Sequence, residues 1–251
     1  MDWRGNEIEL TASGGGVFAF VNPWEGVVRG SVEPWPPPEL VQKLYQSNHS
    51  KAFAGAAKSG ATSYLGYYSD LQSMHSEDAV TWSLFGPIAY ASSDVRARFT
   101  TELLELLGFP KTVGNARIWL WRRLHHPDTR VSGGPEIDFA IQTGDTSILG
   151  ESKWRSGLGG NQGAKRDKDQ IQLRVEYCIK HGAEVYPQVS QFIVLAVGRG
   201  SNLLTDVHRA LGGAKVMMCE TTWDKLGGLS ANPFSGEFRA HLAWRTKYSK
   251  E

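Results

Sequence analysis

Two acidic side chains and a lysine occur at a spacing that could bind a metal ion and activate water. Twelve residues separate Asp138 from Glu151, and Lys153 follows two positions later. Between the two acids, apolar residues flank Thr143-Gly144-Asp145-Thr146 on both sides, a pattern typical of a β-hairpin with a two-residue turn. Mg²⁺ prefers oxygen ligands and is commonly bound through one or two carboxylates. The acids are therefore candidate metal ligands.

The register of this hairpin decides whether the three side chains meet. Counting outward from a two-residue turn places Asp138 directly opposite Glu151, with β-carbons about 5 Å apart on the same face. Lys153 shares that face, because strand side chains alternate between faces. Two acids so close repel each other, whereas a divalent cation would stabilise them. Glu136 lies opposite Lys153 in this register, so an ion pair between them is an alternative role for the lysine.

Composition limits the class of protein without identifying it. The 251 residues carry 27 Lys and Arg against 26 Asp and Glu, so any nucleic-acid-binding surface must be local. Cys178 and Cys219 lack metal-ligand spacing and are expected to be buried and reduced. No stretch reaches the roughly 18 apolar residues of a membrane span, and no apolar signal region is evident at the start. We expect a soluble, cytoplasmic protein.

Periodicity predicts a mixed sheet with helices on both faces. The hairpin's polar face carries Glu136, Asp138, Glu151 and Lys153, which is too polar to bury without a purpose. Expected strands cover residues 17–21, 27–32, 116–124, 136–142, 147–154, 192–197 and 215–219. One expected helix begins at Pro38, and another follows the cap Ser76. Further helices are expected over residues 50–58, 93–107, 167–181 (ended by Gly182), 202–211 and 236–247.

The acid, the hairpin and the sequence Glu151-Ser152-Lys153 resemble the signature of the restriction-endonuclease-like PD-(D/E)xK nuclease superfamily. The resemblance covers residues 77–198 approximately. It implies a three-layer α/β/α core with a central mixed sheet in residues 71–251, after an N-terminal extension or subdomain of unknown role in residues 1–70. It also implies a divalent-metal-dependent nuclease, with DNA favoured over RNA and a restriction or defence role as a family expectation.

The resemblance assigns roles to the hairpin residues one by one. Asp138 and Glu151, helped by the backbone carbonyl of Ser152, would bind catalytic Mg²⁺, for which Mn²⁺ can substitute. Lys153 would orient or deprotonate the attacking water and offset charge in the transition state. Metal and lysine together supply what phosphodiester hydrolysis requires: an activated water, a Lewis acid and charge stabilisation.

Two further catalytic residues are implied on the flanking helices. Glu77 resembles the acidic residue that many superfamily members carry on the first core helix as a metal ligand. Its alternative role is that of a first-turn acid stabilised by the helix dipole, and Asp78 competes for the metal role. Gln170 resembles a glutamine that holds the active site in several families, but Arg174 stands four residues later where those families have tyrosine.

A glycine-rich basic segment, residues 154–168, is expected to contact the nucleic-acid backbone, although a solvated loop is the simpler interpretation. The candidate contact residues are Arg155, Lys165, Arg166 and Lys168, with Arg122 and Arg123 from the preceding strand.

Two other functions stay open: a non-catalytic nucleic-acid-binding or assembly module on the same fold, and an unrelated α/β protein with a surface ion-pair cluster. The first usually lacks an acid or the lysine, and neither is missing here. A homodimer or a partner protein is compatible with each.

Overall fold

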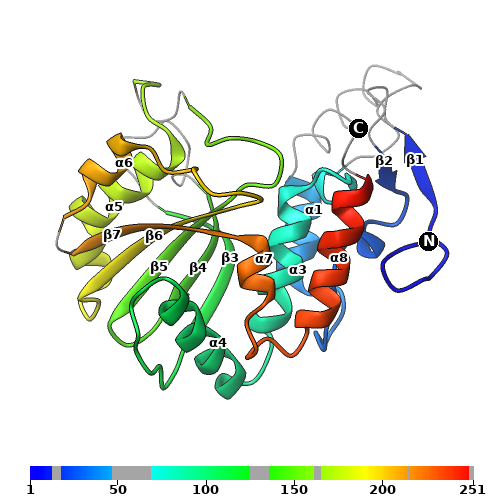
Figure 1. Cartoon of the computed structure of the whole chain (residues 1–251), viewed down its shortest axis with the longest axis horizontal. Coiled ribbons are helices and arrows are strands. Elements are labelled where there is room, and N and C mark those ends of the chain that lie inside the picture. The colour runs from blue at the N-terminus through cyan, green and yellow to red at the C-terminus, as the bar shows by residue number, and fades with distance from the viewer. Residues whose placement is uncertain (13–17, 47–68, 125–135, 161–164, 214, 249–251) are drawn as a thin grey trace. The chain divides into compact units, whose positions relative to one another are not determined.

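The structure, a computed structural model, describes residues 1–12, 18–46, 69–124, 136–160, 165–213 and 215–248 (Figure 1). Contacts divide the chain into two compact units, which we describe separately. The first unit comprises Met1–Tyr90 and Phe234–Glu251, and the second comprises Ala91–Pro233. This division differs from the boundary expected after residue 70, because it groups residues 71–90 and the C-terminal segment with the N-terminal residues.

The second unit is built on a five-stranded mixed sheet in the order β3-β4-β5-β6-β7. The first three strands pair antiparallel and the last three parallel. In Figure 1, helix α4 lies on one face of this sheet and helices α5 and α6 lie on the other. The arrangement confirms the α/β class with a mixed sheet flanked by helices. The strands are β3 (Arg117–Arg123), β4 (Glu136–Gln142), β5 (Thr146–Ser152), β6 (Gln191–Gly198) and β7 (Val216–Thr222); the helices are α4 (Ser93–Leu106), α5 (Gln170–Val185), α6 (Asp206–Leu211) and α7 (Trp223–Gly227).

The β4–β5 hairpin has the register that its turn predicts. The backbone N–H of Thr143 donates to the carbonyl of Thr146 over 2.8 Å, which closes the turn around Gly144 and Asp145. The cross-strand pairs that follow are Gln142–Ser147, Ile141–Ile148, Ala140–Leu149 and Phe139–Gly150. The ladder confirms the predicted register as far as Phe139–Gly150, and the next position outward on each strand is Asp138 and Glu151.

The polar face of the hairpin is more buried than its composition indicates. Ala140 and Leu149 lie on this face between the charged positions, and they pack in one apolar cluster with Ile171 and Val175 of α5. The helix therefore covers the face on which the candidate site lies. Several polar side chains become buried as a result, including Ser147, Glu151 and Lys153.

Helix α5 continues past the residue expected to end it. Gly182 was assigned to the helix end, but it lies inside α5, which ends at Val185. A β-carbon at Gly182 would lie 2.7 Å from Cζ of Phe192 in β6. The glycine is therefore explained by close approach of the Phe192 ring, which is a tertiary constraint.

The first unit holds its segments together through the C-terminal helix. The guanidinium of Arg245 is buried and donates to the carbonyls of Gly26 (2.8 Å), Ser73 (3.1 Å) and Met74 (2.8 Å). Helix α3 is buried throughout residues 79–88. The elements of this unit are β1 (Leu10–Ala12), β2 (Phe18–Phe20), the 3-10 helices η1 (Pro23–Gly26) and η2 (Asp70–Gln72), α1 (Pro38–Gln46), α3 (Glu77–Ala89) and α8 (Ser235–Tyr248).

Other expectations had mixed outcomes. Residues 27–32 form no strand, whereas the caps at Ser76 and Ser92 start α3 and α4 as helix-start signals predict. The helix expected over residues 50–58 lies outside the described residues. In the part of the chain that the structure describes, no helix combines the length and apolar character needed to cross a membrane.

Substitution of Gly150 tests whether close packing next to Glu151 contributes to the stability of the fold. A β-carbon there would collide with the ring of Phe139, which is fully buried. We expect Gly150→Ala to lower the free energy of unfolding by about 1–3 kcal/mol, because overpacking forces neighbouring side chains out of their rotamers. Urea denaturation measures the change. The control Gly144→Ala introduces a β-carbon with no heavy atom within 4 Å and should shift stability far less; equal losses would contradict this account.

Candidate metal and catalytic site

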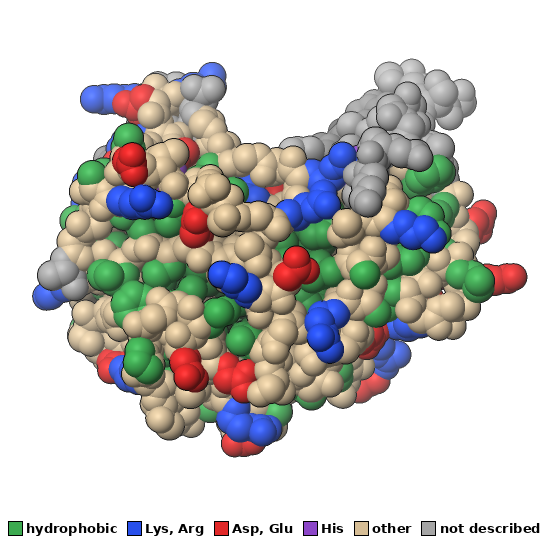
Figure 2. Space-filling model, in the orientation of Figure 1, with side chains coloured by type: hydrophobic (Ala, Val, Ile, Leu, Met, Phe, Trp, Pro, Cys, Tyr) green, Lys and Arg blue, Asp and Glu red, His purple; other side chains and the backbone are tan. Residues whose placement is uncertain are grey.

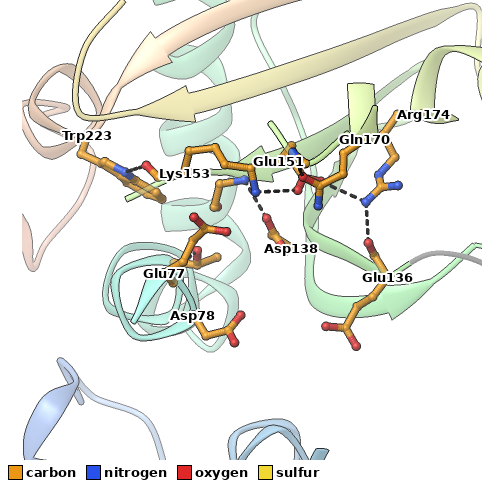
Figure 3. A network of polar contacts seen from close by, with 12 residues as sticks. Glu77, Asp78, Glu136, Asp138, Glu151, Lys153, Gln170, Arg174 and Trp223 are labelled. Atoms are coloured by element: carbon orange, nitrogen blue, oxygen red, sulfur yellow. Dashed lines mark hydrogen bonds and ion pairs between the residues drawn. The ribbon is translucent and has the colours of Figure 1, made fainter. Parts of the chain in front are cut away.

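The carboxylate of Glu151 lies at the centre of a buried charge cluster near the end of β5 (Figure 3). Lys153 Nζ donates to Oε1 over 2.9 Å, and Arg174 Nη2 donates to Oε2 over 2.9 Å. Glu151 is 0% exposed, Arg174 2% and Lys153 4%. Each carboxylate oxygen is thus paired with a different cation, as a buried acid requires.

Asp138 lies beside this cluster and is anchored to the opposing strand. Its Oδ2 accepts a 2.7 Å hydrogen bond from the backbone N–H of Ser152. Backbone pairing between β4 and β5 ends at Phe139–Gly150. Beyond that pair, the side chain of Asp138 accepts the N–H of Ser152 in place of a backbone carbonyl of β4. Ser152 therefore contributes its N–H to the site, and the proposed metal role of its carbonyl stays a prediction. Asp138 itself is half-buried.

The protonation of Glu151 is set by opposing effects. Burial raises the pKa of its carboxyl most, and the negative charge of Asp138 raises it further. The cations Arg174 and Lys153 act in the opposite direction, and the net result is a pKa raised from 4.5 to about 7. The two acids repel each other, as their predicted proximity requires.

Lys153 is held at both its side chain and its backbone. Its N–H donates to the carbonyl of Val197 in β6 over 2.7 Å, and its own carbonyl accepts a 2.9 Å hydrogen bond from Trp223 Nε1 in α7. The side chain pairs with Glu151, and Figure 3 shows the carboxylate of Glu136 pointing away from the lysine. The observed ion pair of Lys153 is with Glu151, its neighbour two residues away.

Arg174 is the site residue that sequence reasoning missed. It was noted as a departure from the tyrosine of related families, but the structure brings it into contact with Glu151 and, through the same Nη2, with the carbonyl of Glu136. The available signal was its position one helical turn after Gln170. Gln170 has a different contact: its Oε1 accepts the backbone N–H of Gly159 over 3.0 Å. Gln170 therefore holds the segment that precedes α5 in place, and its catalytic role stays a prediction.

Glu77 belongs to the other unit, where it begins α3 after the N-cap Ser76. Its neighbour Asp78 is paired with Lys43, with 3.2 Å between Oδ1 and Nζ. This pairing gives Asp78 a structural contact within the first unit. The assignment of Glu77 to the metal stays a prediction.

The basic residues expected to contact nucleic acid fall into two groups. Lys168 is tied to Glu176 by a 2.6 Å ion pair, and the guanidinium of Arg122 lies over the ring of Trp119. Acidic and basic side chains are interspersed over the face of the molecule drawn in Figure 2, in keeping with the nearly balanced charge. Lys168 is half-buried, and the other five candidates are exposed on the surface: Arg122, Arg123, Arg155, Lys165 and Arg166.

The two acids fit a hard divalent cation. The two negative charges lie on adjacent strands and repel each other, and a bound cation would relieve this repulsion. Among the described residues, no group of three or more His, Cys, Asp or Glu side chains is placed to hold a metal. An ion bound by Asp138 and Glu151 would therefore take its other ligands from backbone, water or substrate oxygens, which is typical of Mg²⁺.

The raised pKa of Glu151 predicts a pH-dependent contribution to stability in EDTA. The native carboxyl keeps its proton up to about pH 7, whereas the unfolded one loses it near 4.5. The native state binds more protons between these values, so Glu151 lowers stability progressively as pH rises through this window. We expect the stability difference, wild type minus Glu151→Gln, to be smaller at pH 8 than at pH 5 in urea denaturation. A difference that is the same at both pH values would contradict the raised pKa.

Comparison with known proteins found no matching family model, no matching curated protein and no matching solved structure.

Proposed function

We propose that this protein is a divalent-metal-dependent nuclease that hydrolyses phosphodiester bonds, with DNA as the favoured substrate. The observation that carries the proposal is the burial of Glu151 beside Asp138, with Lys153 on its carboxylate. Burying one acid beside a second, half-buried acid is unfavourable for folding alone. A site that binds a cation and a phosphate gives the arrangement a function.

The residues of the site have separate roles in this reaction. Asp138 and Glu151 would hold the metal, Mg²⁺ or Mn²⁺, which when bound supplies a Lewis acid for the phosphoryl oxygen and lowers the pKa of water. Lys153 is ion-paired with Glu151, and an ammonium group donates hydrogen bonds but cannot accept a proton. We therefore assign Lys153 to orienting the attacking water and stabilising the developing negative charge, in preference to a role as general base.

A second candidate function is a non-catalytic nucleic-acid-binding or assembly module. One observation favours it: Lys153 and Arg174 already compensate both oxygens of Glu151, so the buried charge is balanced by the chain's own side chains. Such a module would bind nucleic acid without cleaving it and would not require a divalent ion.

Substitution of the site residues tests the nuclease proposal. We expect wild-type protein to cleave plasmid or single-stranded DNA with Mg²⁺ or Mn²⁺ but not with EDTA. Asp138→Ala and Lys153→Ala should each lower the rate by roughly 10²-fold or more, because each removes charge that acts in the transition state. Gel electrophoresis of the products measures the rate.

The matched control is Asp206→Asn, which removes an exposed acid whose side chain is 98% accessible. It should cleave at the wild-type rate. Intact substrates under every metal condition would overturn the enzyme proposal in favour of the binding module. Full activity in either site variant would instead overturn the residue assignment.

The exposed basic residues predict a salt-dependent affinity for DNA. Each lysine or arginine that neutralises a phosphate contributes about −0.9 to the slope of log affinity against log salt concentration. We therefore expect Arg155→Ala and Lys165→Ala each to make the slope less steep by about one unit in fluorescence-anisotropy titrations with EDTA present. Exposed Arg239 of the other unit provides the comparison variant Arg239→Ala. Unchanged slopes in the Arg155 and Lys165 variants would remove these residues from the interface.

A further inference from the structure

Arg174 is an unusual residue to bury in a helix that covers a sheet. It is 2% exposed, and one nitrogen, Nη2, makes both of its hydrogen bonds. The other two guanidinium nitrogens, Nε and Nη1, are buried and have no hydrogen-bond partner among the described residues. Leaving buried donors unpaired is costly, so packing and stability do not explain this arginine.

The two contacts of Nη2 link three elements at one point. Arg174 on α5 reaches Oε2 of Glu151 near the end of β5 and the backbone carbonyl of Glu136 at the start of β4. The carbonyl belongs to the backbone and cannot rotate away, so it fixes where the guanidinium lies. Lys153 meanwhile holds the other oxygen of Glu151 from the same strand.

We infer that Arg174 is a positioning residue, which holds the Glu151 carboxylate in a single orientation so that it can bind the divalent ion. This inference rests on the proposed function and deepens it. Arg174 acts through Glu151 and touches neither substrate nor metal. Lysine cannot replace it fully, because its shorter side chain does not bring an ammonium to the position of Nη2, from which both the carbonyl and the carboxylate are reached.

Metal affinity is the direct measurement. Partners that orient a metal ligand typically change metal affinity 10- to 100-fold when removed. We expect Arg174→Met to raise the Mn²⁺ dissociation constant by about this factor, and Arg174→Lys by less, as measured from free Mn²⁺ by electron paramagnetic resonance. The control Glu176→Gln breaks the Lys168–Glu176 ion pair of the same helix and should bind Mn²⁺ as wild type does.

Kinetics separate positioning from catalysis. In Arg174→Met, saturating Mg²⁺ should restore most of the maximal cleavage rate, because only the half-saturating Mg²⁺ concentration has changed. Lys153→Ala should stay slow at every Mg²⁺ concentration. A loss of maximal rate in Arg174→Met that Mg²⁺ does not restore would overturn the positioning role.

Thermal unfolding in the absence of metal tests the ion pair between Arg174 and Glu151. In EDTA, Arg174→Met leaves Glu151 buried without one of its cations, so its Tm should fall further than that of the double variant Arg174→Met/Glu151→Gln. If Arg174→Met does not fold, Arg174→Lys decides the metal measurement.

The outcomes distinguish the two proposals. A folded Arg174 variant with wild-type Mn²⁺ affinity would overturn this inference and leave the nuclease proposal standing. Absence of both Mn²⁺ binding and cleavage in the wild type would overturn the proposed function, and this inference with it.

Discussion

The buried carboxylate of Glu151 is the constraint on which the second unit depends. A charge taken out of water must be compensated, and the compensation comes from Lys153 on the same strand and Arg174 on α5. The apolar contacts of α5 with Ala140 and Leu149 exclude water from the site. Packing of the helix and pairing of the charges therefore depend on each other, because the helix that buries the acid also delivers one of its cations.

A comparison of the two buried arginines shows how structural and functional roles differ. Arg245 of the first unit has no acidic partner in its described contacts; all three of its nitrogens donate, to three backbone carbonyls and to Nε2 of His241. Nη1 and Nη2 join α8 to other segments of the fold, and Nε bonds to His241 within the same helix. Arg174 bonds through one nitrogen, and its other two have no partner within the described parts of the chain. This is unfavourable for stability but suits the placing of a carboxylate.

Local patterns predicted local structure well. Alternation and a two-residue turn predicted the register of the hairpin, because strand side chains have a fixed period of two and a short turn leaves no freedom to slip. The same reasoning failed for Gly182, where the helix continues past a residue that usually ends helices. The ring of Phe192 in the following strand, β6, leaves no room for a β-carbon at position 182. Helix propensity does not include this tertiary constraint.

The sequence by itself determined that Asp138 and Glu151 oppose each other and that Lys153 shares their face, since these relations follow from counting residues along two strands joined by a tight turn. Only the tertiary structure decided how that face is covered and which groups hold the acids. Arg174 reaches Glu151, and Gln170 turns to Gly159 instead, because the rotation of α5 against the sheet is set by the packing of its apolar residues, such as Ile171 and Val175. That rotation is a long-range property, and spacing within the helix could identify the two residues as neighbours without showing which one faces the acid.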